Sequence, residues 1–260
     1  MKTMAITGGS SGIGKVTSQV FAACGYRVYE LSRHGAGGNG ITHIDCDITD
    51  RDACCRAVRA VIEDCGKIDV LINNAGMGIS GAVEFTDMDE AKRQFDVNFF
   101  GAINVTQAVL PYMRAVQEGR IIFVSSLAAE FPIPFQGFYS ASKAAVNSLA
   151  CALRNELSPF GIGVCCMLPG DVRTNFTASR TKSNAGSDVY KSMNRAVATM
   201  EHDEQNGLSS MQIARKLLSM AEAKRPGMYC TTGLKYHAIM FLNRLLPKSF
   251  VNFVVGKIYG

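Results

Sequence analysis

The first thirty residues carry the pattern that most restricts how this chain can fold. A short apolar strand is predicted at 4–7, and the glycine-rich turn 8–14 follows it directly. Apolar residues then recur at three-to-four spacing as far as Cys24, which predicts a helix that ends at Gly25. A second strand is predicted at 27–31. Strand, turn, helix and strand in this order form a βαβ unit, whose two strands lie parallel in one sheet.

The glycine-rich turn indicates a dinucleotide site, because glycines let the backbone approach a pyrophosphate and the helix N-terminus offers it free N–H groups. The end of the second strand should select the coenzyme. An acidic residue there would bind the ribose 2′-hydroxyl of NAD, whereas an arginine accepts the 2′-phosphate of NADP. The chain has Ser32 and Arg33 at this place, and its nearest acid, Glu30, lies inside the strand. These residues favour NADP(H), with NAD(H) as the alternative if Arg33 is only a solvated loop cation.

Strands and helices continue to alternate after this unit, which predicts an α/β fold with a parallel sheet. The further strands are predicted at 41–44, 69–72, 120–126, 162–168 and 228–231. The further helices are predicted at 49–65, 87–113, 139–157 and 208–221. No linker or internal repeat interrupts the pattern, so residues 1–260 are interpreted as a single domain.

The composition excludes several other classes of protein. The formal net charge of +5 suits an anionic coenzyme and is too small for a nucleic-acid-binding surface. The nine cysteines form no Cys-x-x-Cys pair and no signal peptide is evident, which favours reduced thiols in a cytoplasmic protein. His43 and Cys46 have no second pair of ligands to complete a metal site, so no metal is predicted. No apolar run reaches the about 18–20 residues that cross a bilayer.

Two segments outside the alternating pattern have compositions of their own. Residues 171–207 are rich in Ser, Thr, Asn and Ala, which is typical of a mobile lid over a substrate. The tail, residues 235–260, combines apolar residues with basic ones and has no acidic residue. A basic amphipathic helix can lie on a membrane surface. Such a tail more often covers a cleft or joins subunits, so these two roles are favoured over a membrane contact. The apolar loop 131–135 is a candidate wall for a hydrophobic substrate.

Tyr139 and Lys143 lie four residues apart and therefore share one face of a helix. A neighbouring cation favours the phenolate and lowers the tyrosine pKa from about 10, which makes the phenol useful as a general acid or base. Ser126, at the end of an upstream strand, can meet the start of this helix across one cleft. The alternative is an ordinary solvated pair on a helix surface.

Four signatures with the same order and spacing resemble those of the short-chain dehydrogenases/reductases over about residues 3–235. They are Thr7-Gly8-x-x-x-Gly12-Ile13-Gly14, Asn73-Asn74-Ala75-Gly76, Ser126 with Tyr139-x-x-x-Lys143, and Pro169-Gly170. The tail is similar, more loosely, to that of hydroxysteroid-dehydrogenase-like members. The resemblance implies a doubly wound, Rossmann-type sheet of seven parallel strands with helices on both faces.

The resemblance also implies roles for individual residues. Tyr139 would exchange the proton, and Ser126 would hold the substrate oxygen. Lys143 would bind the nicotinamide ribose and lower the Tyr139 pKa, while Asn98 would position a helix kink and a water of the proton relay. The glycine-rich turn would hold the pyrophosphate through Gly8, Ser10, Gly12, Ile13 and Gly14, with Ser11 where many NADP-dependent members carry a basic residue. The other coenzyme contacts would be Ser32 and Arg33 at the 2′-phosphate, Asp47, Ile48, Asn74, Ala75 and Gly76 at the adenosine, and Pro169, Gly170, Val172 and Thr174 at the nicotinamide.

The expected function is an NADP(H)-dependent oxidoreductase that interconverts a ketone and a secondary alcohol on an apolar, steroid-like or other hydrophobic substrate. The candidate wall residues are Met77, Ile79, Phe131, Ile133 and Phe135. The alternatives are a 3-oxoacyl-thioester reductase and a non-enzymatic NADPH-sensing protein. By the same resemblance, a homodimer or homotetramer is expected, and nucleic acid is not expected as a partner.

Overall fold

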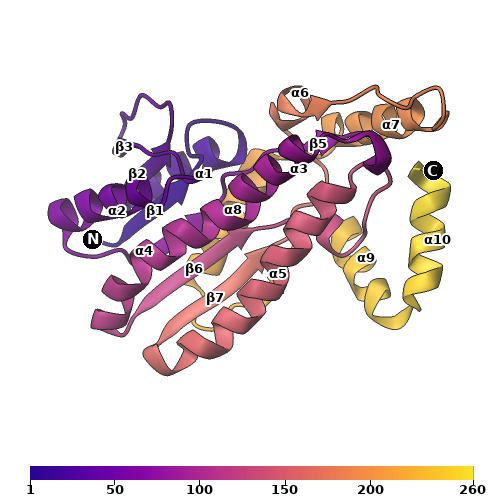
Figure 1. The fold of residues 1–260 in the computed structure, drawn as a ribbon. Coiled ribbons are helices and arrows are strands. Elements are labelled where there is room, and N and C mark those ends of the chain that lie inside the picture. Colours follow the sequence, from indigo (N-terminus) through magenta and orange to yellow (C-terminus); the bar gives the residue numbers. More distant parts are fainter. Residues whose placement is uncertain (260) are drawn as a thin grey trace.

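A sheet of seven parallel strands runs through the centre of the molecule, in the order β11-β7-β6-β4-β1-β2-β3 (Figure 1). The structure is a computed structural model and describes residues 1–259. The strands are β1 (Thr3–Thr7), β2 (Arg27–Ser32), β3 (Ile41–Asp45), β4 (Val70–Asn73), β6 (Gly119–Val124), β7 (Ile162–Met167) and β11 (Tyr229–Cys230). The predicted strands are confirmed within two residues, and so is the predicted Rossmann-type fold.

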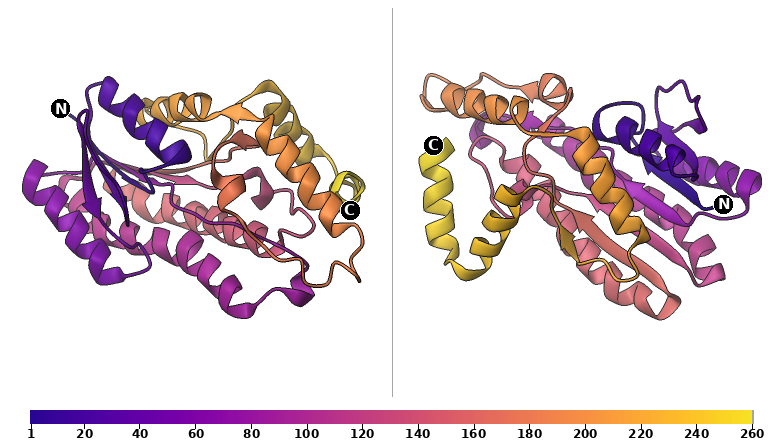
Figure 2. Two further views of the ribbon diagram at one scale, coloured as in Figure 1. Left: turned by 90° about the horizontal axis from the view of Figure 1, so that it is seen from above. Right: turned by 180° about the vertical axis from the view of Figure 1, so that it is seen from behind.

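Helices cover both faces of this sheet (Figure 2). One face packs against α1 (Gly12–Ala23) and α8 (Ser210–Glu222), and the other against α2 (Arg51–Cys65), α4 (Gly101–Val116) and α5 (Gly137–Leu157). Successive strand residues point to opposite faces, so Ala5 joins the α2, α4 and α5 core while Met4 and Ile6 join the α1 and α8 core. All three side chains are fully buried.

The single helix predicted at 87–113 is interrupted. The structure has α3 (Met88–Phe95), a π-helical turn (Asp96–Phe100) and then α4. The buried Asn98 side chain accepts the N–H of Met77 at 2.8 Å and donates to the Met77 carbonyl at 3.0 Å and to Ser142 Oγ at 3.0 Å. These bonds to the loop after β4 and to α5 account for the wider turn, which is a common device at functional sites.

The lid segment, residues 171–207, contains more regular secondary structure than its composition predicts. It contains β8 (Val172–Arg173), α6 (Phe176–Ser179), β9 (Thr181–Lys182) and α7 (Met193–Gln205), and β10 (Leu208–Ser209) follows it. Strand β9 pairs with β5 (Ile79–Ser80), and β10 pairs with β8. Short 3₁₀ turns occupy Val83–Phe85, Leu127–Ala129 and Ser158–Phe160.

The tail forms two helices, α9 (Leu234–Leu245) and α10 (Lys248–Tyr259), which meet at an angle around Pro247 (Figure 1). Two tyrosine hydroxyls fasten it to the lid segment: Tyr236 donates to Asp171 at 2.8 Å, and Tyr259 donates to Asp203 at 3.1 Å. Within residues 1–259, no helix has both the length and the apolar character needed to cross a bilayer.

The carboxyl ends of the central strands meet at one edge of the sheet, where polar contacts hold the loops together. Thr7 Oγ1 accepts the N–H groups of Asn74 and Ala75 at 2.9 and 3.0 Å. Gly14 follows this turn on α1, and a Cβ there would lie only 2.2 Å from the Gly8 carbonyl oxygen. Glycine is therefore required at position 14 for the turn and helix to pack this closely.

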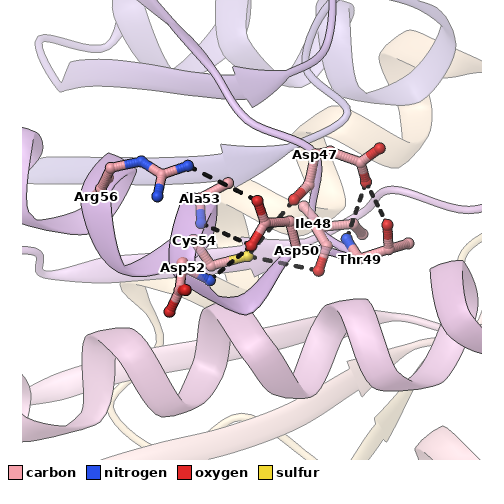
Figure 3. A network of polar contacts seen from close by, with 8 residues as sticks. All are labelled: Asp47, Ile48, Thr49, Asp50, Asp52, Ala53, Cys54 and Arg56. Atoms are coloured by element: carbon pink, nitrogen blue, oxygen red, sulfur yellow. Dashed lines mark hydrogen bonds and ion pairs between the residues drawn. The ribbon is translucent and has the colours of Figure 1, made fainter.

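Polar contacts also join the residues of the loop between β3 and α2 (Figure 3). Asp47 accepts the N–H and the hydroxyl of Thr49 at 2.9 and 2.8 Å. Asp50 caps α2 by accepting the N–H groups of Asp52 and Ala53 at 2.8 and 3.1 Å. The predicted N-terminus of this helix is thus confirmed, with Asp50 as the cap.

Replacing Asp50 by Ala should lower the free energy of unfolding by about 1 kcal/mol, because two helix N–H groups lose their acceptor. Urea denaturation of the full chain measures this loss. Asp50→Ser serves as the control, since a serine also caps helices, and it should retain most of the stability. Equal losses in the Ala and Ser variants would contradict a capping role.

Candidate active site

A cavity of about 1130 Å³ extends along the carboxyl edge of the sheet. It begins at the end of β2 and the glycine-rich turn, passes the ends of β4, β6 and β7, and continues between the lid segment and the tail. Crevices at this edge of a doubly wound sheet are where such folds bind ligands.

Nearly all the residues predicted to bind the coenzyme line this one cavity. They are Gly8, Ser10, Ser11, Gly12, Ile13, Ser32, Arg33, Asp47, Ile48, Asn74, Ala75, Gly76, Tyr139, Lys143, Pro169, Gly170, Val172 and Thr174. Gly14 is not among the lining residues and serves the close packing of the turn instead. The coenzyme contacts themselves stay a prediction.

The start of α1 suits a pyrophosphate. The helix begins at Gly12, beside the cavity, and no side chain of Ser11 caps its first N–H groups. Its first turn contains no acidic residue. Free N–H groups at a helix N-terminus are a site for anions, so these residues fit the phosphates of a dinucleotide.

The end of β2 presents Arg33 to the cavity and keeps Glu30 out of it. Arg33 is exposed and lines the cavity, whereas Glu30 is buried and bonded to the His43 ring. Burial alone would raise the pKa of Asp47, but its bonds to Thr49 and the charges of Arg33 and Arg93 together lower it. Arg93 also lines the cavity, although no motif marks it in the sequence. This end of the cavity therefore has two arginines.

Ser126, Tyr139 and Lys143 come together where β6 ends and α5 begins. Ser126 Oγ accepts the N–H of Ala128 at 3.1 Å, and all three residues line the cavity. Lys143 lies one helical turn after Tyr139, and its Nζ is 5.9 Å from the centre of the Tyr139 ring. The ammonium donates to the carbonyl of Val124, the last residue of β6, at 2.9 Å.

The electrostatics of Tyr139 differ from the expectation. Burial raises the pKa of Tyr139, although hydrogen bonding with Ser126 and the charge of Arg180 act to lower it. Burial also lowers the pKa of Lys143 to about 8. The prediction that Lys143 lowers the Tyr139 pKa is therefore wrong for this arrangement, because desolvation outweighs the nearby charges and the ammonium is directed at the Val124 carbonyl. A neutral phenol is the favoured form, which suits a proton donor.

Asn98 does not line the cavity but is bonded to Met77, which does. Its amide joins Met77 to Ser142, and the Ser142 hydroxyl donates to the Tyr139 carbonyl at 2.8 Å. Asn98 is not among the residues that line the cavity, so its side chain positions the loop after β4 and the first turn of α5. The irregular turn expected at this residue is present.

The apolar half of the cavity has walls from three segments. Met77, Phe131 and Ile133 line it as predicted, whereas Ile79 is buried in β5 and the Phe135 ring packs 6.1 Å from that of Tyr190. The tail supplies a wall that was not predicted residue by residue: Tyr236, Ile239, Leu242, Leu246, Phe250, Val251, Val254, Val255, Ile258 and Tyr259. In the sequence, the helical spacing of these apolar residues was the signal that could have identified this wall.

The lid segment brings an aromatic ring and charged groups to the same half. The ring of Phe176 lies 5.8 Å from that of Tyr139, and Arg180 stacks over Phe176 and pairs with Glu204. Asp171, Asp203 and Glu204 line the cavity between lid and tail. Within residues 1–259, no group of His, Cys, Asp or Glu side chains is arranged to hold a metal ion.

The sequence model of a family described as short chain dehydrogenase matches residues 2–185. A 3-ketodihydrosphingosine reductase of Bacteroides thetaiotaomicron is 41% identical over 98% of this chain and 97% of its own length. A solved short-chain dehydrogenase from Streptomyces avermitilis superposes with a TM-score of 0.80 at 25% identity, covering 94% of each chain. A 3-ketoacyl-(acyl-carrier-protein) reductase from Brucella melitensis, solved with NADH, superposes with a TM-score of 0.76 at 25% identity. The superposition covers 90% of this chain and 96% of that one.

The seven-stranded sheet and the cavity at its carboxyl edge agree with these similarities, which extend over almost the whole chain. The protein is therefore a member of the short-chain dehydrogenase/reductase family, and it is an oxidoreductase.

Proposed function

We propose that the protein uses NADPH to reduce the ketone of a long-chain amino ketone of the 3-ketodihydrosphingosine type. The observation that carries this proposal is the continuous cavity, which runs from Tyr139 along the apolar inner faces of both tail helices. The similarity to a 3-ketodihydrosphingosine reductase over 98% of the chain supports it.

The apolar wall suits a long alkyl chain. Helices α9 and α10 have 12 residues each, which corresponds to about 18 Å per helix. Leu242, Leu246, Phe250 and Val254 contribute to this wall along the two helices. An extended alkyl chain has a comparable length and would bury its surface against these side chains.

The polar groups near Tyr139 suit a substrate that carries an ammonium beside its ketone. Asp171, Asp203 and Glu204 line the cavity between lid and tail. Glu204 contributes to the raised pKa of Tyr139, and Arg180, with which it pairs, acts in the opposite direction. Asp171 and Asp203 are therefore the main acidic groups open to an ammonium. Carboxylates attract an ammonium and repel the phosphates of an acyl carrier. Their position favours an amino ketone over an acyl thioester.

The proposed mechanism assigns one task to each residue. The hydroxyls of Ser126 and Tyr139 donate hydrogen bonds to the ketone oxygen, where negative charge develops. When bound, the reduced nicotinamide supplies a hydride to the carbonyl carbon. Tyr139 then transfers its proton to the oxygen, while Lys143 binds the nicotinamide ribose and holds α5 against β6. Phe176, whose ring lies 5.8 Å from that of Tyr139, shields this step from water.

NADP(H) is the proposed coenzyme, with NAD(H) as the alternative. Arg33 and Arg93 both act on Asp47, so their positive charges lie at the adenosine end of the cavity. Either guanidinium can bind a 2′-phosphate through charge-assisted hydrogen bonds. Glu30, which would serve a free 2′-hydroxyl, is bonded to His43 and does not line the cavity.

We further propose that residues 1–260 act as one coenzyme-binding domain, in which 171–207 form the lid and 235–260 the tail. The expected homodimer or homotetramer and the cytoplasmic location stay predictions. The second candidate function is reduction of 3-oxoacyl thioesters, which the similarity to the Brucella melitensis reductase favours.

A substrate panel tests the proposed reaction. With NADPH, kcat/KM should be highest for 3-ketodihydrosphingosine and lower for its N-acetyl derivative, a 3-oxoacyl thioester and a steroid ketone, because only the first offers an ammonium to the carboxylates. Tyr139→Phe should bind NADPH normally and lose at least about 100-fold in kcat, which is typical for a lost general acid. Preference for the thioester would establish the second candidate, and near-full turnover by Tyr139→Phe would overturn the mechanism.

Replacing Arg33 by Ala should lower kcat/KM for NADPH by about 10- to 100-fold and leave that for NADH almost unchanged. The reason is the loss of a charge-assisted hydrogen bond worth about 1.5–3 kcal/mol. Arg59→Ala is the matched control, since Arg59 is exposed on α2 and is not among the cavity residues. Equal effects on both coenzymes would contradict a contact to the 2′-phosphate.

A further inference from the structure

The tail helices carry apolar side chains on a second face, directed away from the cavity. Leu234, Phe241 and Leu245 are seven and four residues apart, so they share one side of α9. They are 86%, 62% and 65% exposed, and none of them is among the cavity residues. Phe253 on α10 is likewise 60% exposed and outside the cavity lining. We call these four residues the outer stripe.

The opposite side of the same helices forms the cavity wall, and that wall is open. Leu242, Phe250 and Ile258 line the cavity and are still 49%, 50% and 55% exposed. The cavity mouth therefore borders the tail. Both views in Figure 2 show α9 and α10 at the end of the molecule opposite β3, apart from the helices that cover the sheet. The outer stripe and the mouth lie on one projecting hairpin.

All the full charges of the tail are positive. Residues 223–260 contain Lys and Arg but no Asp or Glu. Lys257 is exposed, and its ammonium lies 5.6 Å from the centre of the Phe253 ring in the outer stripe. The side chains of Lys235 and Lys248 are 68% and 70% exposed, and their ammonium groups lie 3.9 Å from Asp171 and Glu130. Lysines beside exposed aromatic and aliphatic side chains are typical of helices that lie on anionic lipid.

The combination of basic and exposed apolar side chains distinguishes a bilayer from a protein partner. The central parts of protein interfaces are depleted of lysine, because its ammonium is costly to desolvate there. At a bilayer, the long lysine stem lies along the apolar surface while the ammonium stays among the headgroups. The exposed Lys257 beside Phe253 and the absence of acidic side chains in the tail therefore favour lipid over a second copy of this chain.

We propose that the outer stripe docks the tail hairpin on the surface of an anionic lipid bilayer. Phe241, Leu245 and Phe253 enter the headgroup boundary, and Lys257, which lies beside Phe253, contacts anionic headgroups. The cavity mouth borders the same two helices on their opposite side, so an apolar substrate passes from the lipid around the edge of α9 and α10 into the cavity. The docking does not depend on the proposed reaction. Only the passage of substrate from the lipid rests on the proposed function.

Co-sedimentation of the full chain with vesicles tests the docking. The protein should bind vesicles made of equal parts phosphatidylcholine and phosphatidylserine, bind phosphatidylcholine vesicles much more weakly, and be released by high salt. The double variant Phe241→Ser, Leu245→Ser should reduce the bound fraction by about 10-fold, the expected effect of removing two buried apolar anchors. The matched control Met88→Ser, Val116→Ser also removes two exposed apolar side chains, which are 56% and 53% exposed and lie outside the tail. It should bind like the unaltered protein.

A second readout separates docking from folding and from the proposed reaction. Turnover of a short water-soluble ketone should stay within about 2-fold in both double variants, because their residues lie outside the cavity. Vesicle binding without turnover of long-chain amino ketones would leave the docking intact and reject the proposed substrate. Absence of vesicle binding, or self-association that the Phe241 and Leu245 changes abolish, would overturn the docking and identify the stripe as a subunit contact.

Discussion

The candidate site depends on one buried hydrogen bond, from the Lys143 ammonium to the Val124 carbonyl at 2.9 Å. Val124 is the last residue of β6, and Ser126 follows it by two residues, so this bond holds the serine beside the first turns of α5. Tyr139 lies one helical turn before Lys143 and is thereby placed against Ser126. The same burial that protects the bond lowers the pKa of Lys143 to about 8 and raises that of Tyr139. A single packing arrangement therefore positions the proposed proton donor and favours its protonated form.

Sequence patterns predicted the sheet, its order of elements and most of the cavity lining, because these depend on local rules. The fully buried strand β1, the turn before α1 and the N-terminus of α2 are each encoded within a few neighbouring residues. The break at Asn98 was expected only from the family resemblance, since its cause is a set of bonds to Met77 and Ser142, residues far away in the chain. Arg93 escaped notice for the same reason. The direction of the Tyr139 pKa was predicted wrongly because four-residue spacing gives no measure of burial.

The tail carries two kinds of apolar surface, both of which suit the proposed reduction of an apolar substrate. Its inner face extends the polar site at Tyr139 into an apolar wall, and its outer stripe leaves large side chains exposed. Tyr236 and Tyr259 fasten the hairpin to Asp171 and Asp203 at its two ends, beside the lid segment. The half of the cavity proposed for the coenzyme is formed by the sheet and its loops, whereas the half proposed for the substrate is formed mainly by segments that follow β7. In this proposal, substrate choice can change through the lid and tail without disturbing the coenzyme site.

The most direct test of the central claim is the pH dependence of kcat/KM in both directions at saturating coenzyme. Reduction needs the protonated phenol, so it should be full below the Tyr139 pKa and fall as the pH rises through it. Oxidation needs the phenolate, so its kcat/KM should rise over the same pH range. Because burial raises the pKa of Tyr139, both changes should occur at alkaline pH. The predicted result is a fall in kcat/KM for reduction and a rise in kcat/KM for oxidation that share one pKa. Flat profiles, or a fall in both directions as the pH rises, would show that Tyr139 is not the group that exchanges the proton.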